Sequence, residues 1–334
     1  MSTTKRLQMS KTLDLNRIYD PVGEDMARVE ERLSAISQVN FPHLSKLLDY
    51  SLKGTGKRIR PILTLLAGKF YDYNVEHLLR MATAVEIMHT ATLVHDDAID
   101  NSPVRRGRLT VNKLWGEEQA VLLGDYMFAE AGALTASTDN LRAIKLFANT
   151  LKTISSGEIN QAANAFNLEQ GRPQYIQRVA QKTASLFTMS TESGAALSQA
   201  PEEAIQVLIE YGYNIGVAFQ IVDDILDFVA TEEELGKPVG SDLAQGTLTL
   251  PAILILEHYP DDNPVKRLFQ DREAKENIKL AIELVHNSPS IIQECYQVAS
   301  DYCARACANL SLLPDSPSRQ SLVDLASYIV IRKK

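Results

Sequence analysis

A helical spacing of apolar residues runs through most of this sequence and limits the folds open to it. Between Ala204 and Leu226 the apolar side chains recur three and four residues apart, as a helix that buries one broad face requires. The same spacing covers residues 75–97, 119–136, 141–166, 174–197, 277–285 and 290–313. No competing stretch alternates apolar and polar residues as a strand would. The pattern predicts an all-α protein.

The breaks between these stretches fall at glycine and proline, and none is long or polar enough to link two domains. They are residues 54–61, 170–173, 236–251 and 313–318. A length of 334 residues permits one domain or two. We predict a single domain, residues 1–334, because the two acidic clusters described below need each other. We expect residues 1–20 to form a flexible N-terminal segment.

Charge and apolar content bear on partners and location. The formal net charge of −8 does not suggest a nucleic-acid partner. We find no signal peptide and no run approaching the roughly 20 apolar residues that a membrane span needs. The cysteines, Cys295, Cys303 and Cys307, fit one buried helix face and have no histidine nearby for a zinc site. We therefore expect a soluble, cytoplasmic protein with core thiols in a reducing compartment.

The spacing D-D-x-x-D occurs twice in apolar helical surroundings. We name the copies the first acidic cluster, Asp96, Asp97 and Asp100, and the second acidic cluster, Asp223, Asp224 and Asp227. Carboxylates four residues apart on a helix repel one another when ionised, and apolar neighbours make this worse unless a cation is present. Their oxygens suit Mg²⁺, whose coordination shell is usually completed by waters and substrate phosphates. The clusters therefore predict Mg²⁺ and a diphosphate substrate.

Each cluster extends along one stripe of its helix. At about 100° per residue, the outer acids of the first cluster lie within about 40° of His89, and Thr92 borders that stripe. Gln220 shares a stripe with the outer acids of the second cluster. The predicted metal ligands are these outer acids, Asp96, Asp100, Asp223 and Asp227.

Basic residues at loops or helix ends near the apolar elements supply the charge that phosphate oxygens need. They are Lys57, Arg60, Arg105, Arg106, Lys182 and Lys237. The stretch GTGKR is not a P-loop, because Ser51 stands where its first glycine should be and Arg58 follows the lysine. No histidine has the base-and-nucleophile context of acyl transfer. The pattern favours metal-assisted departure of a diphosphate.

The sequence resembles the trans-isoprenyl diphosphate synthases, the polyprenyl synthetase family, from about Leu47 to the terminal IRKK. The motifs, in order, are GKRIRP, EIMHTATLVHDDAIDNSPVRRG, LLGDYMFA, SGEINQ, QKTASLF, GVAFQIVDDILDF and GKPVGSDLAQGTLTLP. The resemblance implies the isoprenoid synthase fold, a bundle of long helices around a central cavity, usually homodimeric. It also implies a reaction in which an allylic diphosphate ionises, isopentenyl diphosphate attacks and a proton is lost.

The resemblance assigns roles residue by residue. Isopentenyl diphosphate would be held by Lys57, Arg60, His89 and Arg106. The allylic diphosphate would be held by Arg105, Lys182 and Lys237. The catalytic residues would be Lys182, Thr183 and Gln220, the last two lying near the developing allylic cation. Thr247 departs from the lysine of many members and removes one diphosphate contact, although we expect activity to persist.

Small residues before the first acidic cluster bear on product length. Ala91 and Thr92 stand where short-chain members place aromatics, and Met88 lies about 12 Å further along the helix. Gly132 belongs to a second stretch of small residues. An open tunnel predicts a product of C30 or longer. Geranylgeranyl diphosphate is the alternative if Met88 or Leu134 closes the tunnel.

Two other classes of protein share part of this pattern. A class I terpene cyclase has one D-D-x-x-D cluster, but the second cluster and the basic residues argue for a second diphosphate substrate. A non-catalytic subunit of a heteromeric synthase could lose carboxylates, yet all six persist. The basic tail would either favour a helix C-terminus or fold over the active site, and it comprises Arg332, Lys333 and Lys334. A hydrophobic product predicts transient membrane contact.

Overall fold

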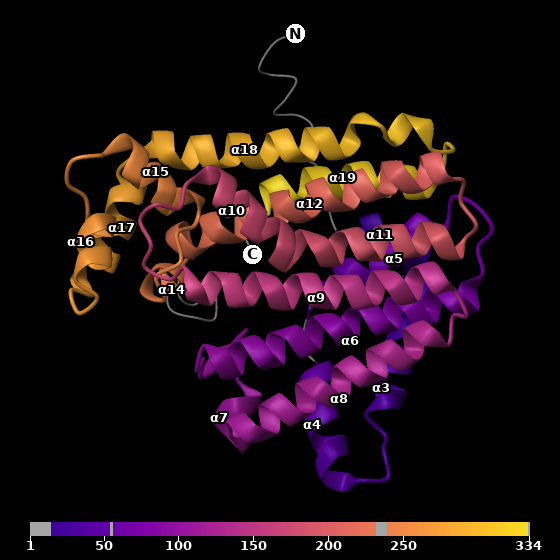
Figure 1. Cartoon of the computed structure of the whole chain (residues 1–334). Helices are drawn as coiled ribbons and strands as arrows, with labels where there is room; N and C mark the ends of the chain where they lie inside the picture. Colours follow the sequence, from indigo (N-terminus) through magenta and orange to yellow (C-terminus); the bar gives the residue numbers. More distant parts are fainter. Residues whose placement is uncertain (1–14, 54–55, 232–238, 333–334) are drawn as a thin grey trace.

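Long helices lie roughly side by side in this computed structural model, with α14 to α17 gathered at one end (Figure 1). The structure describes residues 15–53, 56–231 and 239–332. The α-helices are α2 (Leu15–Tyr19), α3 (Gly23–Ile36), α4 (Pro42–Leu52), α5 (Ile59–Gly68), α6 (Val75–Ile99), α7 (Val111–Trp115), α8 (Glu117–Ala136), α9 (Leu141–Ala163), α10 (Arg172–Val179), α11 (Ser185–Leu197), α12 (Glu202–Val229), α14 (Ser241–Ala244), α15 (Leu250–His258), α16 (Pro264–Gln270), α17 (Glu276–His286), α18 (Pro289–Ala308) and α19 (Pro317–Ile331). The remaining elements are the 3-10 turns η1 (Asp20–Val22) and η3 (Leu310–Leu312), the π-helical segment η2 (Ala180–Ala184), and strands β1 (Val104–Arg105) and β2 (Arg108–Leu109). The predicted all-α fold class is confirmed.

The two helices that carry the acidic clusters run through the core. Helix α6 begins after Asn74, whose side chain accepts a hydrogen bond from the His77 amide at 3.3 Å. Helix α12 is long and apolar enough to cross a membrane by length and composition, but 61% of the qualifying window is buried inside the protein. That hydropathy is accounted for by packing against α11 and α18.

A π-helical segment, η2, lies between α10 and α11. It is approached closely from both sides, because a Cβ at Gly157 of α9 would lie 3.0 Å from the Cβ of Gln181. A Cβ at Gly216 of α12 would lie 2.6 Å from the Cα of Ala184. Both glycines therefore let neighbouring helices pack against η2, and any larger residue would displace it. A π turn inside an α-helix is frequently found at a functional site.

Two local features differ from the sequence-based expectations. Residues 15–20 of the expected flexible segment are helical, and Ile18 is 1% exposed. Strands β1 and β2 form a hairpin after α6, where no strand was expected. Arg106 and Gly107 both have positive φ, of 52° and 74°, as a tight two-residue turn of this type requires. The hairpin is too short to show an alternating pattern.

The three cysteines lie on α18 as free thiols. Cys295 and Cys303 are buried, and Cys307 is partly buried. Burial raises the pKa of each thiol above its ordinary value. The predicted core role of these thiols agrees with their positions.

Candidate functional site

The first acidic cluster lies at the end of α6 and just beyond it. Asp97 is buried, and its Oδ1 accepts a hydrogen bond from Nε of Arg105 at 2.7 Å. Burial raises the pKa of Asp97, and Arg105 opposes that rise. Asp96 Oδ2 lies 3.8 Å from Nζ of Lys182. Asp100 is exposed and follows the last helical residue, with its amide donating to the Asp96 carbonyl at 2.8 Å.

A carboxylate that the sequence analysis did not assign, Glu158 of α9, joins this cluster. Its Oε1 lies 2.7 Å from Nζ of Lys182, which therefore stands between Glu158 and Asp96. Burial alone would lower the pKa of Lys182, but the two acids outweigh burial and raise it. Lys182 is thus held as a cation. Glu158 lies in the motif SGEINQ, and the packing of α9 against η2 brings it to its partner Lys182.

The second acidic cluster lies on α12 and is more enclosed. Asp224 is 3% exposed and accepts hydrogen bonds from the Tyr175 hydroxyl and from Nε2 of Gln220, each at 2.7 Å. Burial raises the pKa of Asp224. Asp227 is 1% exposed and accepts hydrogen bonds from the Ser241 hydroxyl at 3.1 Å and from an α14 backbone amide at 3.4 Å.

Asp223, the remaining acid of this cluster, pairs with the basic tail. Nη2 of Arg332 lies 2.8 Å from Asp223 Oδ1 and donates to the Phe219 carbonyl at 2.7 Å. The guanidinium also stacks on the Phe219 ring, with its Cζ 3.9 Å from the ring centroid. Of the two alternatives for the tail, the structure places Arg332 over the site; residues 333–334 lie outside the described part.

Segment η2 connects the two clusters. Lys182 reaches Asp96 of α6, and the next residue, Thr183, donates its hydroxyl hydrogen to Oε1 of Gln220 on α12 at 2.7 Å. The predicted catalytic residues Lys182, Thr183 and Gln220 are therefore brought together between the clusters. Their common position depends on η2, against which α9 and α12 pack closely at Gly157 and Gly216.

Three basic residues, Lys57, Arg60 and Arg106, lie beside the second cluster and form what we call the cation group. Nη1 of Arg60 is 3.0 Å from Nε2 of His89. Burial and Arg60 lower the pKa of His89 well below its ordinary value, so its ring is neutral and the Arg60 contact leaves its proton on Nδ1. Burial, Arg332 and Arg106 lower the pKa of Lys57 to about 8, although Asp223 opposes them. Positive groups that depress one another's pKa in this way form a receptive site for an anion.

Arg106 is the third member of the cation group. Burial is the main cause of its lowered pKa, and Arg105 and Arg58 add to it. Arg58 itself is engaged elsewhere: its Nη1 donates to Glu86 at 2.6 Å and its Nε to Glu30 at 2.7 Å. Of the basic residues in GKRIRP, Arg58 therefore has a structural role, whereas Lys57 and Arg60 belong to the cation group.

Metal binding would depend on more than the protein. Within the described ranges, no group of three or more His, Cys, Asp or Glu side chains is arranged to hold a metal ion. Two of the four outer acids instead lie close to cations, Asp96 to Lys182 and Asp223 to Arg332. Mg²⁺ commonly takes one or two carboxylates and completes its shell with water and phosphate oxygens. The donor set fits such an ion when a diphosphate is present.

Three of the predicted chain-length residues, Met88, Ala91 and Thr92, lie on α6, and Gly132 lies on α8. Met88 and Ala91 are each 0% exposed, and the Thr92 hydroxyl bonds to the His89 carbonyl at 2.7 Å. No sequence motif singles out Phe147 of α9. Its ring lies against Gly132, where a Cβ would be 3.4 Å from the Phe147 Cε1. The stretch of small residues on α8 is therefore partly filled by an aromatic from a neighbouring helix.

Lys237, predicted to contact the allylic diphosphate, is outside the described residues. Thr247 follows α14, and its amide donates to the Asp242 carbonyl at 2.9 Å.

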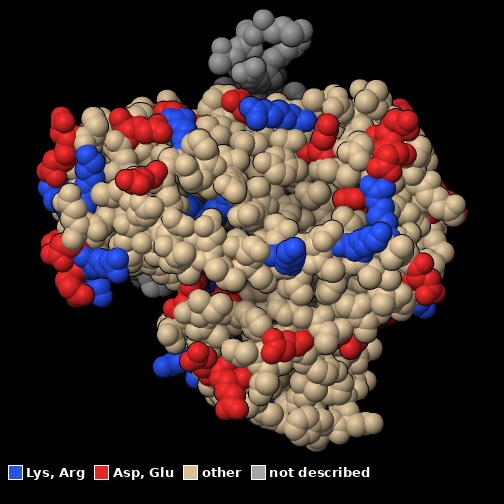
Figure 2. All heavy atoms as spheres, viewed as in Figure 1, with Lys and Arg blue, Asp and Glu red and all other residues tan. Residues whose placement is uncertain are grey.

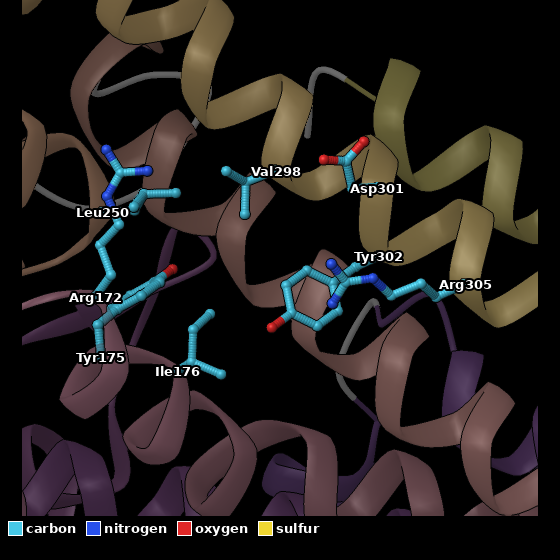
Figure 3. Close-up of a pocket in the computed structure, with 8 residues that line it drawn as sticks. All are labelled: Arg172, Tyr175, Ile176, Leu250, Val298, Asp301, Tyr302 and Arg305. Carbon is cyan, nitrogen blue, oxygen red and sulfur yellow. The ribbon is translucent and has the colours of Figure 1, made fainter.

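A pocket of about 220 Å³ lies between α10, α15 and α18 (Figure 3). Its lining residues include Arg172, Tyr175, Val298 and Tyr302, and neither acidic cluster contributes to it. It is therefore separate from the predicted active site. The Tyr175 ring forms part of its wall, while the hydroxyl of the same residue bonds to Asp224.

Comparison with known proteins gives a consistent result. The polyprenyl synthetase family model matches residues 41–285. Heptaprenyl diphosphate synthase component 2 of Bacillus subtilis (strain 168) is 36% identical, over 94% of this chain and 90% of the relative. Solanesyl-diphosphate synthase 2, chloroplastic, of Oryza sativa subsp. japonica is 37% identical, over 95% of this chain and 79% of the relative.

Solved structures agree. A polyprenyl synthase from Caulobacter crescentus CB15, complexed with calcium and isoprenyl diphosphate, superposes with a TM-score of 0.89 at 32% identity, over 96% of this chain and 98% of that one. Further matches are named for octaprenyl, decaprenyl and geranylgeranyl products.

Proposed function

This chain belongs to the polyprenyl synthetase family and is a prenyltransferase, and we propose that it makes a long all-trans product, of C30 or longer. It would condense isopentenyl diphosphate with an allylic diphosphate. One observation carries the assignment of two diphosphates: two acidic clusters are linked through Lys182 and Thr183, with a separate group of cations beside them. A cyclase binds a single diphosphate and therefore does not need a separate group of cations.

Each group of site residues would act on a different part of the reaction. Arg105, Lys182 and Lys237 would bind the allylic diphosphate. Lys57, Arg60, His89 and Arg106 would hold isopentenyl diphosphate, with the neutral His89 ring donating from Nδ1. Thr183 and Gln220 would face the developing allylic cation. The proton lost from the condensed product would pass to the released diphosphate.

Mg²⁺ is the proposed cofactor. Asp96, Asp100, Asp223 and Asp227 would hold it directly or through water, together with diphosphate oxygens. The ion would supply stabilisation of the negative charge on the departing diphosphate. The protein itself places Lys182 beside Asp96, where the lysine cation would also neutralise charge on the departing diphosphate. The calcium and isoprenyl diphosphate in the Caulobacter structure support this proposal by analogy.

Product length is the finer part of the proposal. The absence of an aromatic side chain at Ala91 and Thr92 supports a long product, as do relatives named for heptaprenyl and solanesyl products. Geranylgeranyl diphosphate is the alternative product, because Phe147 fills space beside Gly132 and would shorten a tunnel that passes there. The name of the Bacillus relative, component 2, keeps a second subunit in consideration for this chain.

Assembly and location are also proposed. Helices α8 and α9 expose apolar side chains, including Val121 at 42%, Leu122 at 55% and Leu141 at 63%. Figure 2 shows broad uncharged areas on the face that carries these helices. A homodimer would bury them, because a second copy presents the same apolar surface. We propose a cytoplasmic homodimer that contacts membranes transiently to release its product.

The test is incubation of the purified protein with radiolabelled isopentenyl diphosphate, farnesyl diphosphate and Mg²⁺, with products resolved by chain length. Products of C30 or longer support the proposal in full. A product that stops at C20 identifies the geranylgeranyl alternative. If folded protein makes no product until a partner subunit is added, the heteromeric alternative holds instead.

A further inference from the structure

A chain of side-chain hydrogen bonds runs from α10 into the centre of the site. The Tyr175 hydroxyl donates to Asp224 Oδ2 at 2.7 Å. Asp224 Oδ1 accepts from Nε2 of Gln220 at 2.7 Å, and Oε1 of Gln220 accepts from the Thr183 hydroxyl at 2.7 Å. Residues far apart in sequence, on α10, η2 and α12, thus hold one another through successive bonds.

These bonds determine which end of the Gln220 amide faces Asp224. With the NH₂ group toward Asp224, a donor meets an acceptor. When Asp224 is ionised, a flipped amide would set Oε1 of Gln220 against Oδ1 of Asp224, and two acceptors would then be left in contact. Tyr175 binds the second oxygen of the same carboxyl group and so fixes its plane. The carbonyl end of Gln220 is therefore kept on the side of Thr183.

We propose that Tyr175 and Asp224 are positioning residues that keep the Gln220 carbonyl oxygen turned toward the developing allylic cation, an inference that rests on the proposed function. The negative end of a carbonyl dipole stabilises positive charge, and it does so most when it is oriented before the reaction. Tyr175 is 1% exposed. It acts on the reaction through Asp224 and Gln220 rather than by touching a substrate.

The experiment compares Tyr175→Phe in the wild-type and Gln220→Ala backgrounds. Loss of the hydroxyl alone should lower kcat by about 3- to 10-fold, the effect of one hydrogen bond, and should leave KM for both diphosphates within about 2-fold. In the Gln220→Ala background the same change should alter kcat by less than about 2-fold, because the group it orients is gone. An equal loss of kcat in both backgrounds, or no loss in the wild type, would overturn the proposal.

Tyr211→Phe is the matched control. Tyr211 is also buried on α12, and its hydroxyl donates to the Leu322 carbonyl at 2.8 Å, away from Gln220. It should lower the melting temperature about as much as Tyr175→Phe but leave kcat unchanged. A similar fall in kcat for both variants would show a general loss of packing and contradict the positioning role.

A second pair of variants keeps the test decisive if Tyr175→Phe does not fold. Asp224→Asn retains an oxygen that can accept from Gln220, whereas Asp224→Leu, of similar size, does not. The Asn variant should keep at least about 10-fold more kcat than the Leu variant. Equal values would overturn the proposal. Failure of the proposed function is distinct, since the wild-type protein itself would then form no elongated product.

Discussion

The two acidic clusters share a spacing but differ in how their acids are held. In both, the middle acid is buried, Asp97 at 6% and Asp224 at 3% exposure. Asp97 is paired with a charged group, Arg105, which lies on the hairpin after α6. Asp224 is held by the neutral donors Tyr175 and Gln220. The first cluster is thus organised by charge and the second by hydrogen bonds.

This difference separates two roles within one motif. One outer acid of each cluster lies near a long basic side chain, Asp96 near Lys182 and Asp223 near Arg332, and we expect substrate and metal to displace these contacts. The middle acids hold neighbouring structure in place. A repeated motif therefore does not mean repeated chemistry at each position, and substitutions should distinguish the positions.

The largest expected effect is on the outer acids. Asp96→Ala or Asp223→Ala should lower turnover at least about 100-fold for every allylic primer, because each removes an oxygen ligand for Mg²⁺. Steady-state rates at several Mg²⁺ concentrations give the measurement. Wild-type rates in either variant would remove the metal assignment.

The next effect sharpens the contrast in what precedes each cluster. Ala91 and Thr92, both small, stand five and four residues before the first cluster. The position four residues before the second cluster is already aromatic, Phe219. Ala91→Phe should therefore shorten the product and keep metal-dependent turnover. Product chain length and the melting temperature should be measured together. An unchanged length with a lower melting temperature would mean that Ala91 only packs against its neighbours.

A smaller effect concerns the cations beside the second cluster. The pKa of Lys57 is lowered to about 8, so Lys57 loses its positive charge as pH rises through that value. Binding of an anionic diphosphate to the free enzyme should weaken above about pH 8, by up to about 10-fold per pH unit if this charge is essential. The quantity to follow is kcat/KM for isopentenyl diphosphate. Lys57→Arg should remove that dependence, and an identical profile in this variant would assign it to another group.

The smallest effect tests the middle acids directly. Asp97→Asn should lower the free energy of unfolding by about 1 kcal/mol, since Arg105 is partly exposed and solvent screens the pair. The loss should shrink at high salt. Asp224→Asn should show a loss that salt does not change, because its partners are neutral. Denaturant unfolding at low and high salt compares the two, and equal salt dependence would erase the distinction.

Local patterns in the sequence were sufficient for the helices and for the stripes of acids, because both depend on a repeat of 3.6 residues. The partners of those acids were not predictable. Tyr175 is 49 residues from Asp224, and Arg332 is far along the chain from Asp223, so only the packing of helices brings them together. The sequence pattern predicts an ordinary helix across η2, because its π turn depends on contacts at Gly157 and Gly216.

The contact of Arg332 with Asp223 and Phe219 has a practical consequence for crystallography. Crystals grown without diphosphate and metal would fix the end of α19 across the second cluster. A soaked ligand would then have to displace that segment inside a packed lattice. Co-crystallisation lets the displacement take place in solution, and we expect it to succeed where soaking leaves the site closed.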